Sequence, residues 1–414
     1  MTDLPDAAIP VNVIPVSVIV VSRHRPAALL RCILALTHQD HSKLELIVVA
    51  DPEAIVQVQA LGLSLKCVMF DEANISAARN AGIALAAATI VAFIDDDAVA
   101  EPTWAKRLVA PFTDPRVIAS TGFIRARNGI SYQWRACEVD QFGQDHPLEI
   151  SQTTLLASTR QRAVKTQGTN CAFRRDVLLQ IGGFDPAYRF FLDEADVNLR
   201  MAGMGLTAIV PDAQVHHGYF ASPRRAANRV PLNLQDIAAS TALFLRRHAP
   251  LADETVALTS LSLRESARIA QHRRAGRINA QAELALLGSM TQGWAEGLTR
   301  PLTDLSPLTS TNTALRLLKT GPRPGKVLAG RFWQKRRLLA QAAASSDTIT
   351  TVFVFSPTAR PHKMSFQPEG YWLQTGGIFG RSDRESPRFR WISFRKRVTD
   401  ETARLKRFRP IRQF

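Results

Sequence analysis

Apolar runs of strand length alternate with helical patterns along the first hundred residues, and this alternation limits the folds open to the chain. Residues 16–21 and 90–94 are unbroken apolar runs, typical of strands that are buried on both faces. The elements between them are strand-like runs at 44–49 and 67–70 and helical patterns at 26–36 and 75–88. A repeated strand–helix–strand order predicts an α/β fold, with a mostly parallel sheet between layers of helices.

Three consecutive carboxylates, Asp95, Asp96 and Asp97, follow the last of these strands. Like charges this close raise one another's pKa values, so the cluster is tolerated most easily where a cation lies beside it. Ligands of open α/β sheets bind just beyond the carboxyl ends of the strands. Carboxylate oxygens at that place suit a divalent metal with a diphosphate. Taken alone, the triplet is more readily interpreted as an acidic turn that caps a helix.

Composition sets the broad class of the protein. The chain has 414 residues, of which 46% are hydrophobic, so it can bury a large core in two or three domains. The first residues lack the basic and apolar regions of a secretory signal. The longest nearly apolar stretch, 81–94, is shorter than the roughly 20 residues of a spanning helix. Four cysteines lie far apart without a Cys-x-x-Cys pair. We therefore expect a cytoplasmic protein with reduced thiols.

Positive charge is concentrated near the C-terminus. Residues 321–414 contain 20 Lys/Arg and 6 Asp/Glu, a balance of +14, whereas the rest of the chain contains 32 and 30. Such a region predicts an anionic partner (acidic phospholipid, a polyanionic product or nucleic acid) or serves as a solubilising face. Aromatic residues alternate with the arginines there, a pattern that suits nucleic-acid bases, sugar rings or lipid headgroups.

An ordered set of segments between residues 14 and 220 resembles family 2 glycosyltransferases, which have the GT-A fold. The matching segments are 18–26, 45–51, 74–83, the Asp-x-Asp motif at 95–97, 168–175, 182–185, 193–196 and 211–218. Dinucleotide-binding, P-loop and α/β-hydrolase motifs are missing from the corresponding places. The resemblance implies an inverting, metal-dependent transferase that uses a nucleotide-sugar donor.

The resemblance also implies roles for individual residues. Metal ligands, for Mn²⁺ or Mg²⁺, are expected at Asp97, Asp95 and His217, with His216 as the alternative histidine. Donor-binding residues are expected at Ser22, Asp51, Arg79, Asp95 and Asp96. The acceptor side is expected to hold Asn170, Phe184 and Asp196, although Asp196 and Arg200 could equally form an ordinary surface ion pair.

A general base is needed to take the proton of the acceptor hydroxyl, and a carboxylate near the acceptor suits this task. By position Glu194 takes this role, with Asp193 as the alternative. The family more commonly has Glu-Asp-x-Asp where this chain has Asp-Glu-Ala-Asp at 193–196. Carboxylates in a first helical turn are also favoured by the helix dipole, which is a structural explanation for one of them.

The expected domain organisation follows from these segments and from composition. It comprises an N-terminal tail (1–13), a GT-A catalytic domain (14–225), a helical extension (226–300), a linker (301–330) and a basic C-terminal region (331–414). Amphipathic patterns at 232–247, 255–271 and 278–298 predict three helices in the extension.

The expected function is transfer of a sugar from a nucleotide-sugar donor to a hydroxyl of a glycan or lipid-linked acceptor. Cell-surface polysaccharide biosynthesis is the expected setting, in the cytoplasm or peripherally on the cytoplasmic membrane face. One alternative is a sugar nucleotidyltransferase, which would need a Gly-rich loop after the first strand that residues 22–26 do not supply. The other is a nucleic-acid-binding protein on a degenerate transferase scaffold, against which the retained acidic positions argue.

Overall fold

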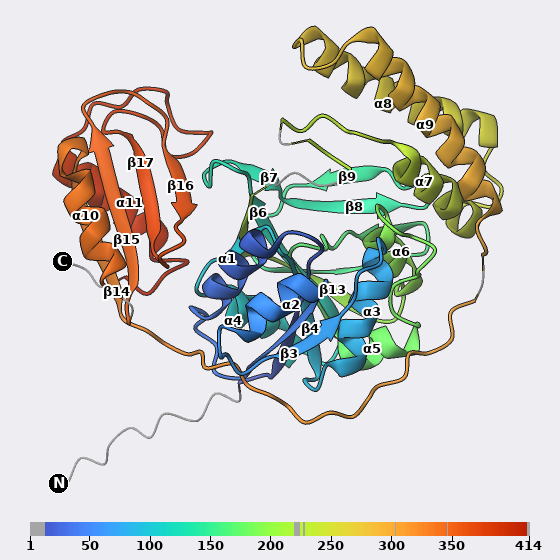
Figure 1. Cartoon of the computed structure of the whole chain (residues 1–414), viewed down its shortest axis with the longest axis horizontal. Coiled ribbons are helices and arrows are strands. Elements are labelled where there is room, and N and C mark those ends of the chain that lie inside the picture. The colour runs from blue at the N-terminus through green and yellow to red at the C-terminus, as the bar shows by residue number, and fades with distance from the viewer. Residues whose placement is uncertain (1–12, 219–223, 227, 303, 346, 412–414) are drawn as a thin grey trace.

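The computed structural model describes residues 13–218, 224–226, 228–302, 304–345 and 347–411. Nearly all of the expected N-terminal tail therefore lies outside the described residues. The largest part of the molecule is a sheet with helices on both faces. A smaller sheet with its own two helices is packed beside it (Figure 1).

The large sheet is mixed. Its strands are β1 (Val16–Val21), β2 (Leu44–Ala50), β3 (Lys66–Met69), β4 (Ile90–Asp95), β5 (Ala98–Ala100), β6 (Val117–Arg125), β7 (Tyr132–Trp134), β10 (Thr154–Ala157), β12 (Cys171–Arg174) and β13 (Leu206–His217). The main order is β10-β13-β6-β12-β4-β1-β2-β3. Strands β3, β2, β1 and β4 are parallel, and β12 pairs antiparallel with both β4 and β6. The predicted α/β class is confirmed.

Helices cover both faces of this sheet because successive strand residues point to opposite sides. One face carries α1 (Pro26–Leu36), α2 (Pro52–Gln59) and α4 (Trp104–Val109), and the other carries α3 (Ile75–Leu85), α5 (Arg175–Gln180) and α6 (Asp193–Arg200). In β1, Val18 and Val20 belong to the first core, whereas Ile19 belongs to the second. Each such buried side chain contributes about 1.5–3 kcal/mol, so the apolar run at 16–21 holds both layers.

A second layer of structure lies over the carboxyl side of the sheet. It consists of the strands β8 (Ala136–Asp140), β9 (Asp145–Leu148) and β11 (Arg162–Val164) and the helix α7 (Gln235–His248). Phe244 of α7 packs on Tyr188 with ring centroids 6.5 Å apart.

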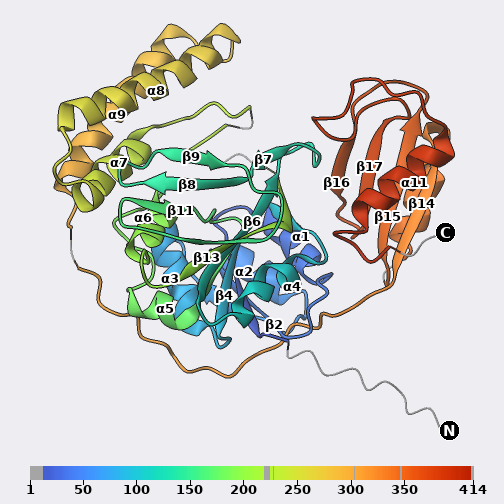
Figure 2. The same ribbon diagram turned by 180° about the vertical axis from the view of Figure 1, so that it is seen from behind.

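The helices α8 (Glu254–Arg274) and α9 (Ala280–Thr299) then form a hairpin that projects from the molecule (Figures 1 and 2). Among the described residues, no helix has an apolar stretch long enough to cross a membrane.

Residues 304–324 pass around the outside of the large sheet before the chain enters the smaller one (Figure 2). This segment is tied to the sheet at several points. Leu308 N–H donates to the carbonyl of Leu179 at 2.9 Å, and Leu318 N–H donates to the carbonyl of Leu44 at 2.8 Å. The proline-rich segment that suggested a linker is therefore an extended segment held on the large-sheet domain.

The smaller sheet and its helices form a unit, residues 325–411, that we call the C-terminal module. Its elements are β14 (Gly325–Arg331), a 3-10 turn (Phe332–Gln334), α10 (Lys335–Ala343), β15 (Ile349–Ser356), β16 (Lys363–Phe366), β17 (Trp372–Gly377) and α11 (Phe394–Leu405). The strand order is β14-β15-β17-β16, with the first three strands parallel. Strand β14 begins inside the stretch that composition suggested as linker.

Both faces of the module sheet are covered, by α10 on one side and α11 on the other (Figures 1 and 2). Val352 and Val354 of β15 pack with α10, whereas Phe353 and Phe355 share a core with α11. That second core also contains Ala35, Val99 and Ile130 of the large-sheet domain. The module therefore shares a hydrophobic core with the large-sheet domain.

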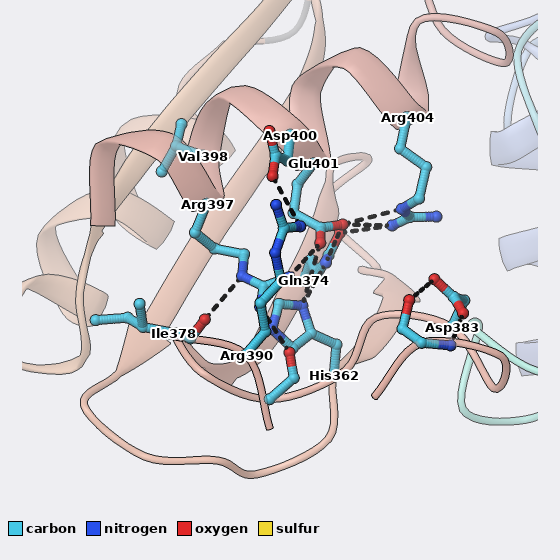
Figure 3. A network of polar contacts seen from close by, with 12 residues as sticks. His362, Gln374, Ile378, Asp383, Arg390, Arg397, Val398, Asp400, Glu401 and Arg404 are labelled. Atoms are coloured by element: carbon cyan, nitrogen blue, oxygen red, sulfur yellow. Dashed lines mark hydrogen bonds and ion pairs between the residues drawn. The ribbon is translucent and has the colours of Figure 1, made fainter. Parts of the chain in front are cut away.

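Helix α11 is fastened to the module sheet by a buried carboxylate (Figure 3). Glu401 accepts hydrogen bonds from Gln374 Nε2 and Arg404 Nε, both at 2.9 Å. It also pairs with Arg397 at 3.3 Å. Burial alone would raise the pKa of Glu401, but Arg404 and the other donors lower it to about 2. Arg397 in turn donates to the carbonyls of Ile378 and Gly380, at 2.8 and 2.9 Å.

A second buried ion pair joins the module to the large-sheet domain. Arg409 donates to both carboxylate oxygens of Glu101, at 2.7 and 2.8 Å, and both side chains are buried. Glu101 also accepts from His216 Nε2 at 2.8 Å. Burial alone would raise the pKa of Glu101, but Arg409 and His216 lower it to about 2. Glu101 follows β5, so the pair holds the module against the strand end next to the acidic triplet.

Candidate active site

Two of the three consecutive carboxylates meet a histidine at the end of β4. Asp95, Asp97 and His217 each offer a ligand atom, and these atoms lie within 4.8 Å of one another. His217 Nε2 is 3.0 Å from Asp97 Oδ1 and 3.9 Å from Asp95 Oδ2. The meeting follows from the topology, since the end of β13 pairs with β5 and sets His217 opposite Ala98. The structure thus brings together the three residues expected to bind metal.

This group fits a divalent cation. Two carboxylate oxygens and one imidazole nitrogen form a ligand set that hard and borderline divalent metals accept. The other ring nitrogen of His217, Nδ1, lies 2.9 Å from Gln133 Oε1, and its ring stacks on Trp134 with centroids 6.3 Å apart. Such outer contacts orient a metal-binding histidine. His216 does not compete for this place, because its Nε2 bonds Glu101.

The charged form of Asp95 would be stabilised by a nearby cation. Its burial raises its pKa, and the charges of Asp97 and Glu194 add to this effect, whereas His217 and Arg79 oppose it. About a third of the Asp95 side chain remains exposed, at 33%. An exposed carboxylate whose charged form is disfavoured would be stabilised by a bound divalent ion.

Asp96 has a different environment from its two neighbours. Its side chain is fully buried, accepts a hydrogen bond from Ser22 Oγ at 2.6 Å and forms an ion pair with Arg25. Arg25 also lies 3.4 Å from Asp97. Burial raises the pKa of Asp96 to about 7, although Arg25 opposes the rise. Ser22 and Asp96, both expected to bind donor, therefore bond each other beneath the site. The cation that the triplet requires is partly supplied by Arg25.

Arg79 of α3 connects the acidic triplet to the residues expected to act on the acceptor. Its guanidinium is buried, forms an ion pair with Asp193, and lies 3.5 Å from Glu194 and 3.9 Å from Asp95. Burial by itself lowers the pKa of a guanidinium, but these three carboxylates raise the pKa of Arg79. Phe184 packs below it, with its ring centroid 5.0 Å from the guanidinium carbon. Arg79 thus links the candidate base to Asp95 through one cation.

Asp193 and Glu194 differ in exposure and in pKa. The Asp193 side chain is only 4% exposed, whereas that of Glu194 is 22% exposed. Burial and the charge of Glu194 raise the pKa of Asp193 well above its usual range. Burial also acts to raise the pKa of Glu194, but Arg79 and a backbone N–H lower it. Of the two carboxylates, Glu194 is the accessible and readily ionised one.

Glu194 is held in place by a glycine. Gly168 N–H donates to Glu194 Oε1 at 3.0 Å. A Cβ atom at position 168 would overlap both this carboxylate oxygen and the guanidinium of Arg79. Any side chain there would displace Glu194 or Arg79.

Helix α6 begins with unusual backbone geometry. Phe191 and Leu192 both have positive φ, at 72° and 63°, a region that non-glycine residues rarely adopt. Leu192 is the residue that caps the helix, so the first helical residues are Asp193 and Glu194. Strain of about 1–3 kcal/mol per residue persists only where the surroundings enforce it and clusters at functional sites. Here it sets the direction in which the two carboxylates leave the helix.

Asp51, expected near the donor base, caps α2. Its carboxylate accepts hydrogen bonds from the backbone N–H of His24 at 2.7 Å and of Ala54 at 3.1 Å. Burial acts to raise the pKa of Asp51, but these two bonds lower it. The residue therefore ties the turn after β1 to the start of α2. In the structure its side chain is 2% exposed.

The three residues expected on the acceptor side are all buried. Asn170 donates to the carbonyls of Phe123 and Ala213 and accepts from Trp104 Nε1 at 2.7 Å. Asp196 pairs with Arg200 at 2.7 Å and lies 3.0 Å from His248 of α7. The possible surface pair between Asp196 and Arg200 is thus a buried one. Together with Phe184 under Arg79, these side chains support the site from below.

Four contributors to the site were not anticipated from sequence: Arg25, Gln133, Trp134 and Gly168. Gln133 and Trp134 reach His217 from β7, a strand more than 80 residues earlier in the chain, and no local pattern marks them. Arg25 stands between two expected elements, in a segment that matched the family turn. Gly168 opens another matched segment, and its lack of a side chain was the available signal.

Part of the chain is similar to known proteins. Residues 17–182 match the family model "Glycosyl transferase family 2". A "Glucosyl-dolichyl phosphate glucuronosyltransferase" of Haloferax volcanii is 30% identical over 155 residues, which are 36% of this chain and 48% of that protein. The chain thus spans about half the length of this curated relative. Residues 17–182 are therefore similar to family 2 glycosyltransferases.

Two solved structures are similar in part. One is GalNAc-T7 with UDP, GalNAc and Mn²⁺, with 15% identity and a TM-score of 0.44 over 57% of this chain and 48% of that one. The other is the mannosyltransferase PcManGT from Pyrobaculum calidifontis in complex with GDP-Man and Mn²⁺. It has 18% identity and a TM-score of 0.41 over 69% of this chain and 87% of that one.

Proposed function

We propose that the protein is an inverting, metal-dependent glycosyltransferase that moves a sugar from a nucleotide-sugar donor to a hydroxyl of a glycan or lipid-linked acceptor. The observation that carries this proposal is the bridge made by Arg79. Its guanidinium lies within 3.9 Å of both Asp95, beside the candidate metal group, and Glu194, the candidate base. A donor diphosphate and an acceptor hydroxyl would then meet at one place, as single displacement requires.

In this mechanism Asp95, Asp97 and His217 would hold the divalent metal, Mn²⁺ or Mg²⁺. When bound, the metal neutralises negative charge on the diphosphate that leaves. Glu194 takes the proton of the attacking hydroxyl through a carboxylate oxygen, and its low pKa keeps it ionised for this task. Asp193, which stays the alternative base, would instead hold Arg79 in place through their direct contact. Ser22, Asp51 and Asp96 would shape the donor side from beneath the site.

The acceptor class is proposed from the relative. The Haloferax volcanii protein is named for transfer to a glucosyl-dolichyl phosphate, a sugar on a lipid phosphate. A lipid-linked acceptor in cell-surface polysaccharide assembly, met on the cytoplasmic membrane face, is our proposal for this chain. In this division of labour, residues 14–225 carry out transfer and the later regions serve the acceptor.

A donor screen tests the proposal. Release of nucleoside diphosphate is measured across UDP- and GDP-sugars, including UDP-glucuronic acid, with Mn²⁺ or Mg²⁺ and with a chelator. We expect release with one donor class that depends on added metal. NMR of the product then gives the anomeric configuration, and inversion is expected. Retention would exclude the single-displacement mechanism, and release unaffected by chelator would exclude the metal.

A further inference from the structure

The parallel strands of the C-terminal module end at one edge, and aromatic side chains project from it. Phe332 and Trp333 directly follow the end of β14. Phe379 comes two residues after the end of β17 and stacks on Trp391, with centroids 5.0 Å apart and rings 3° from parallel. Register pairing aligns the ends of the three strands, since Arg331 faces Phe355, which faces Gly376. We call Phe332, Trp333, Phe389 and Trp391 the aromatic edge.

The side chains of the aromatic edge stand out from the surface. Their exposed fractions are 55% for Phe332, 66% for Trp333, 54% for Phe389 and 81% for Trp391. A site for a small ligand is concave and encloses most of the ligand. Large aromatic groups that project into solvent instead suit a soft, deformable partner such as the headgroup layer of a bilayer.

Cations surround these aromatic residues in the sequence. Residues 331–346 contain four Lys/Arg and no Asp or Glu, and residues 386–399 contain five Lys/Arg and no Asp or Glu. The exposed cations in these two stretches are Lys335, Arg336, Arg337, Arg388, Arg390, Arg395 and Lys396. Three nearby carboxylates already have partners. Asp400 pairs with Arg390 at 3.1 Å and with Lys396 at 2.8 Å, Glu385 pairs with Arg135 at 2.9 Å, and Asp383 accepts hydrogen bonds from Ser386.

The edge is also rigidly built. The turn that carries Phe379 is held by Arg397, which donates to the carbonyls on either side of this residue and is itself paired with Glu401 (Figure 3). Arg331 lies over the ring of Phe394 at 4.5 Å, which joins the end of β14 to the start of α11. A preorganised edge loses little conformational freedom on binding.

We infer that the aromatic edge with its cations docks the protein on the surface of an anionic lipid bilayer. Trp and Phe would enter the headgroup layer while Lys and Arg meet lipid phosphates. The choice of a lipid surface as partner rests on the lipid-linked acceptor proposed above. Docking itself needs neither donor nor metal, so it can fail while sugar transfer stands.

The experiment is co-sedimentation of the full chain with vesicles of phosphatidylcholine alone or mixed with phosphatidylglycerol. We expect at least tenfold stronger binding to the anionic vesicles, weakened by salt because exposed charges are screened over about 10 Å at 0.1 M. The variant Trp333→Ala/Trp391→Ala should lose at least tenfold of this binding. Arg336→Gln/Arg337→Gln should lose roughly tenfold as well, since each cation near the headgroups strengthens attachment measurably.

A matched control lies on the α8–α9 hairpin, where Leu263 and Leu284 are 68% and 70% exposed. Leu263→Ala/Leu284→Ala should leave vesicle binding unchanged. Brominated lipid gives a direct readout: it should quench tryptophan fluorescence of the wild type and not of Trp333→Phe/Trp391→Phe, which should still bind. Thermal unfolding should be the same in all variants, because the substituted side chains are exposed.

Three outcomes would overturn the inference: equal binding to neutral and anionic vesicles, loss of binding in the hairpin control alone, or no vesicle binding with tight binding of a single-stranded oligonucleotide. Donor binding, followed by calorimetry without lipid, separates this result from the proposed function. Intact donor binding with no docking rejects only the inference. Docking without any donor binding rejects only the sugar-transfer proposal.

Discussion

The catalytic domain and the C-terminal module both gather the ends of parallel strands at one edge, but the two edges carry opposite charge. In the catalytic domain, β4 ends in Asp95, Asp96 and Asp97. In the module, β14 ends in Arg331, and aromatic residues with arginines follow. The topology thus determines where a ligand can bind, and the side chains at the strand ends determine the charge of the ligand that binds there. The acidic edge suits a metal with its diphosphate, and the basic edge suits an anionic surface.

The largest effect that would sharpen this comparison is expected at the acidic edge. Asp97→Asn should lower transfer by about 10³-fold or more, because metal stabilisation of the leaving group is worth several kcal/mol and each 1.4 kcal/mol is a factor of ten. Turnover is measured with the donor found in the screen. Asp176→Asn, an exposed aspartate in the first turn of α5, is the matched control and should be fully active. An active Asp97→Asn enzyme in the presence of chelator contradicts the metal site.

The candidate base should give the next effect. Glu194→Gln should lose about 10²–10⁴-fold in turnover, the usual contribution of a positioned base, with little change in donor affinity measured by calorimetry. Glu53→Gln is the control, since Glu53 is exposed and also lies in the first turn of a helix.

Asp193→Asn distinguishes the two carboxylates of this helix. Asp193 pairs with the buried Arg79, so its loss should lower the melting temperature as well as activity. Glu194→Gln should leave the melting temperature nearly unchanged. If Asp193→Asn keeps wild-type stability and is the more damaging change to turnover, the base is Asp193.

Substitutions in the Glu101–Arg409 ion pair, at the interface between the two regions, should change stability by a few kcal/mol. Arg409→Ala leaves Glu101 buried without its main partner and should destabilise the protein by about 3–5 kcal/mol in denaturant unfolding. Glu101→Gln/Arg409→Met removes both charges and should recover much of this loss. An unaffected Arg409→Ala, or a double variant as unstable as Arg409→Ala, would show that the pair does not join module and domain.

Acid should weaken the same ion pair. The folded-state pKa of Glu101 is about 2, below its usual 4.5, so its charged form stabilises the folded protein. That contribution, about 3 kcal/mol, is present above pH 4.5 and is lost as the pH falls toward 2. Glu101→Gln should therefore lose less stability than the wild type over this pH window, as measured by unfolding at each pH.

The smallest effect is expected at Asp95. Because burial raises its pKa in the folded state, its charge opposes folding near neutral pH. Asp95→Asn should stabilise the metal-free protein by about 0.5–1 kcal/mol, a small gain because exposure of the side chain screens its charge. The gain should shrink as the pH falls toward the ordinary value near 3.8. Added Mn²⁺ should raise the melting temperature of the wild type more than that of the variant, and the reverse order would contradict the prediction.

Local patterns in the sequence predicted the donor-side half of the fold well. Strand β1 has the predicted bounds, and β4 ends one residue later than predicted, because unbroken apolar runs between turn residues leave few alternatives. Helix α2 was missed although Asp51, Pro52 and Glu53 are an N-cap, a first-turn proline and a first-turn acid. The fold of the C-terminal module was not predicted, since its core is completed by residues from outside the module.

The site was predictable where a single segment carries it and less so where distant segments meet. Asp95, Asp97 and His217 came together as expected, although Gln133, which orients His217, lies 84 residues away from it. Asn170 was expected to face the acceptor, but three hydrogen bonds to β6, β13 and α4 turn it inward. Whether a polar side chain faces a ligand or the interior depends on such partners, which no spacing reveals.

The ion pair between Glu101 and Arg409 has a consequence for how relatives of this chain can differ. Glu101 belongs to the catalytic sheet, His216 neighbours a candidate metal ligand, and Arg409 comes from the module, yet the three share hydrogen bonds. A chimera that exchanges the module must carry a cation to the place of Arg409 or replace Glu101 as well. Positions 101, 216 and 409 should therefore change together among homologues, as one inherited unit that spans more than 300 residues of chain.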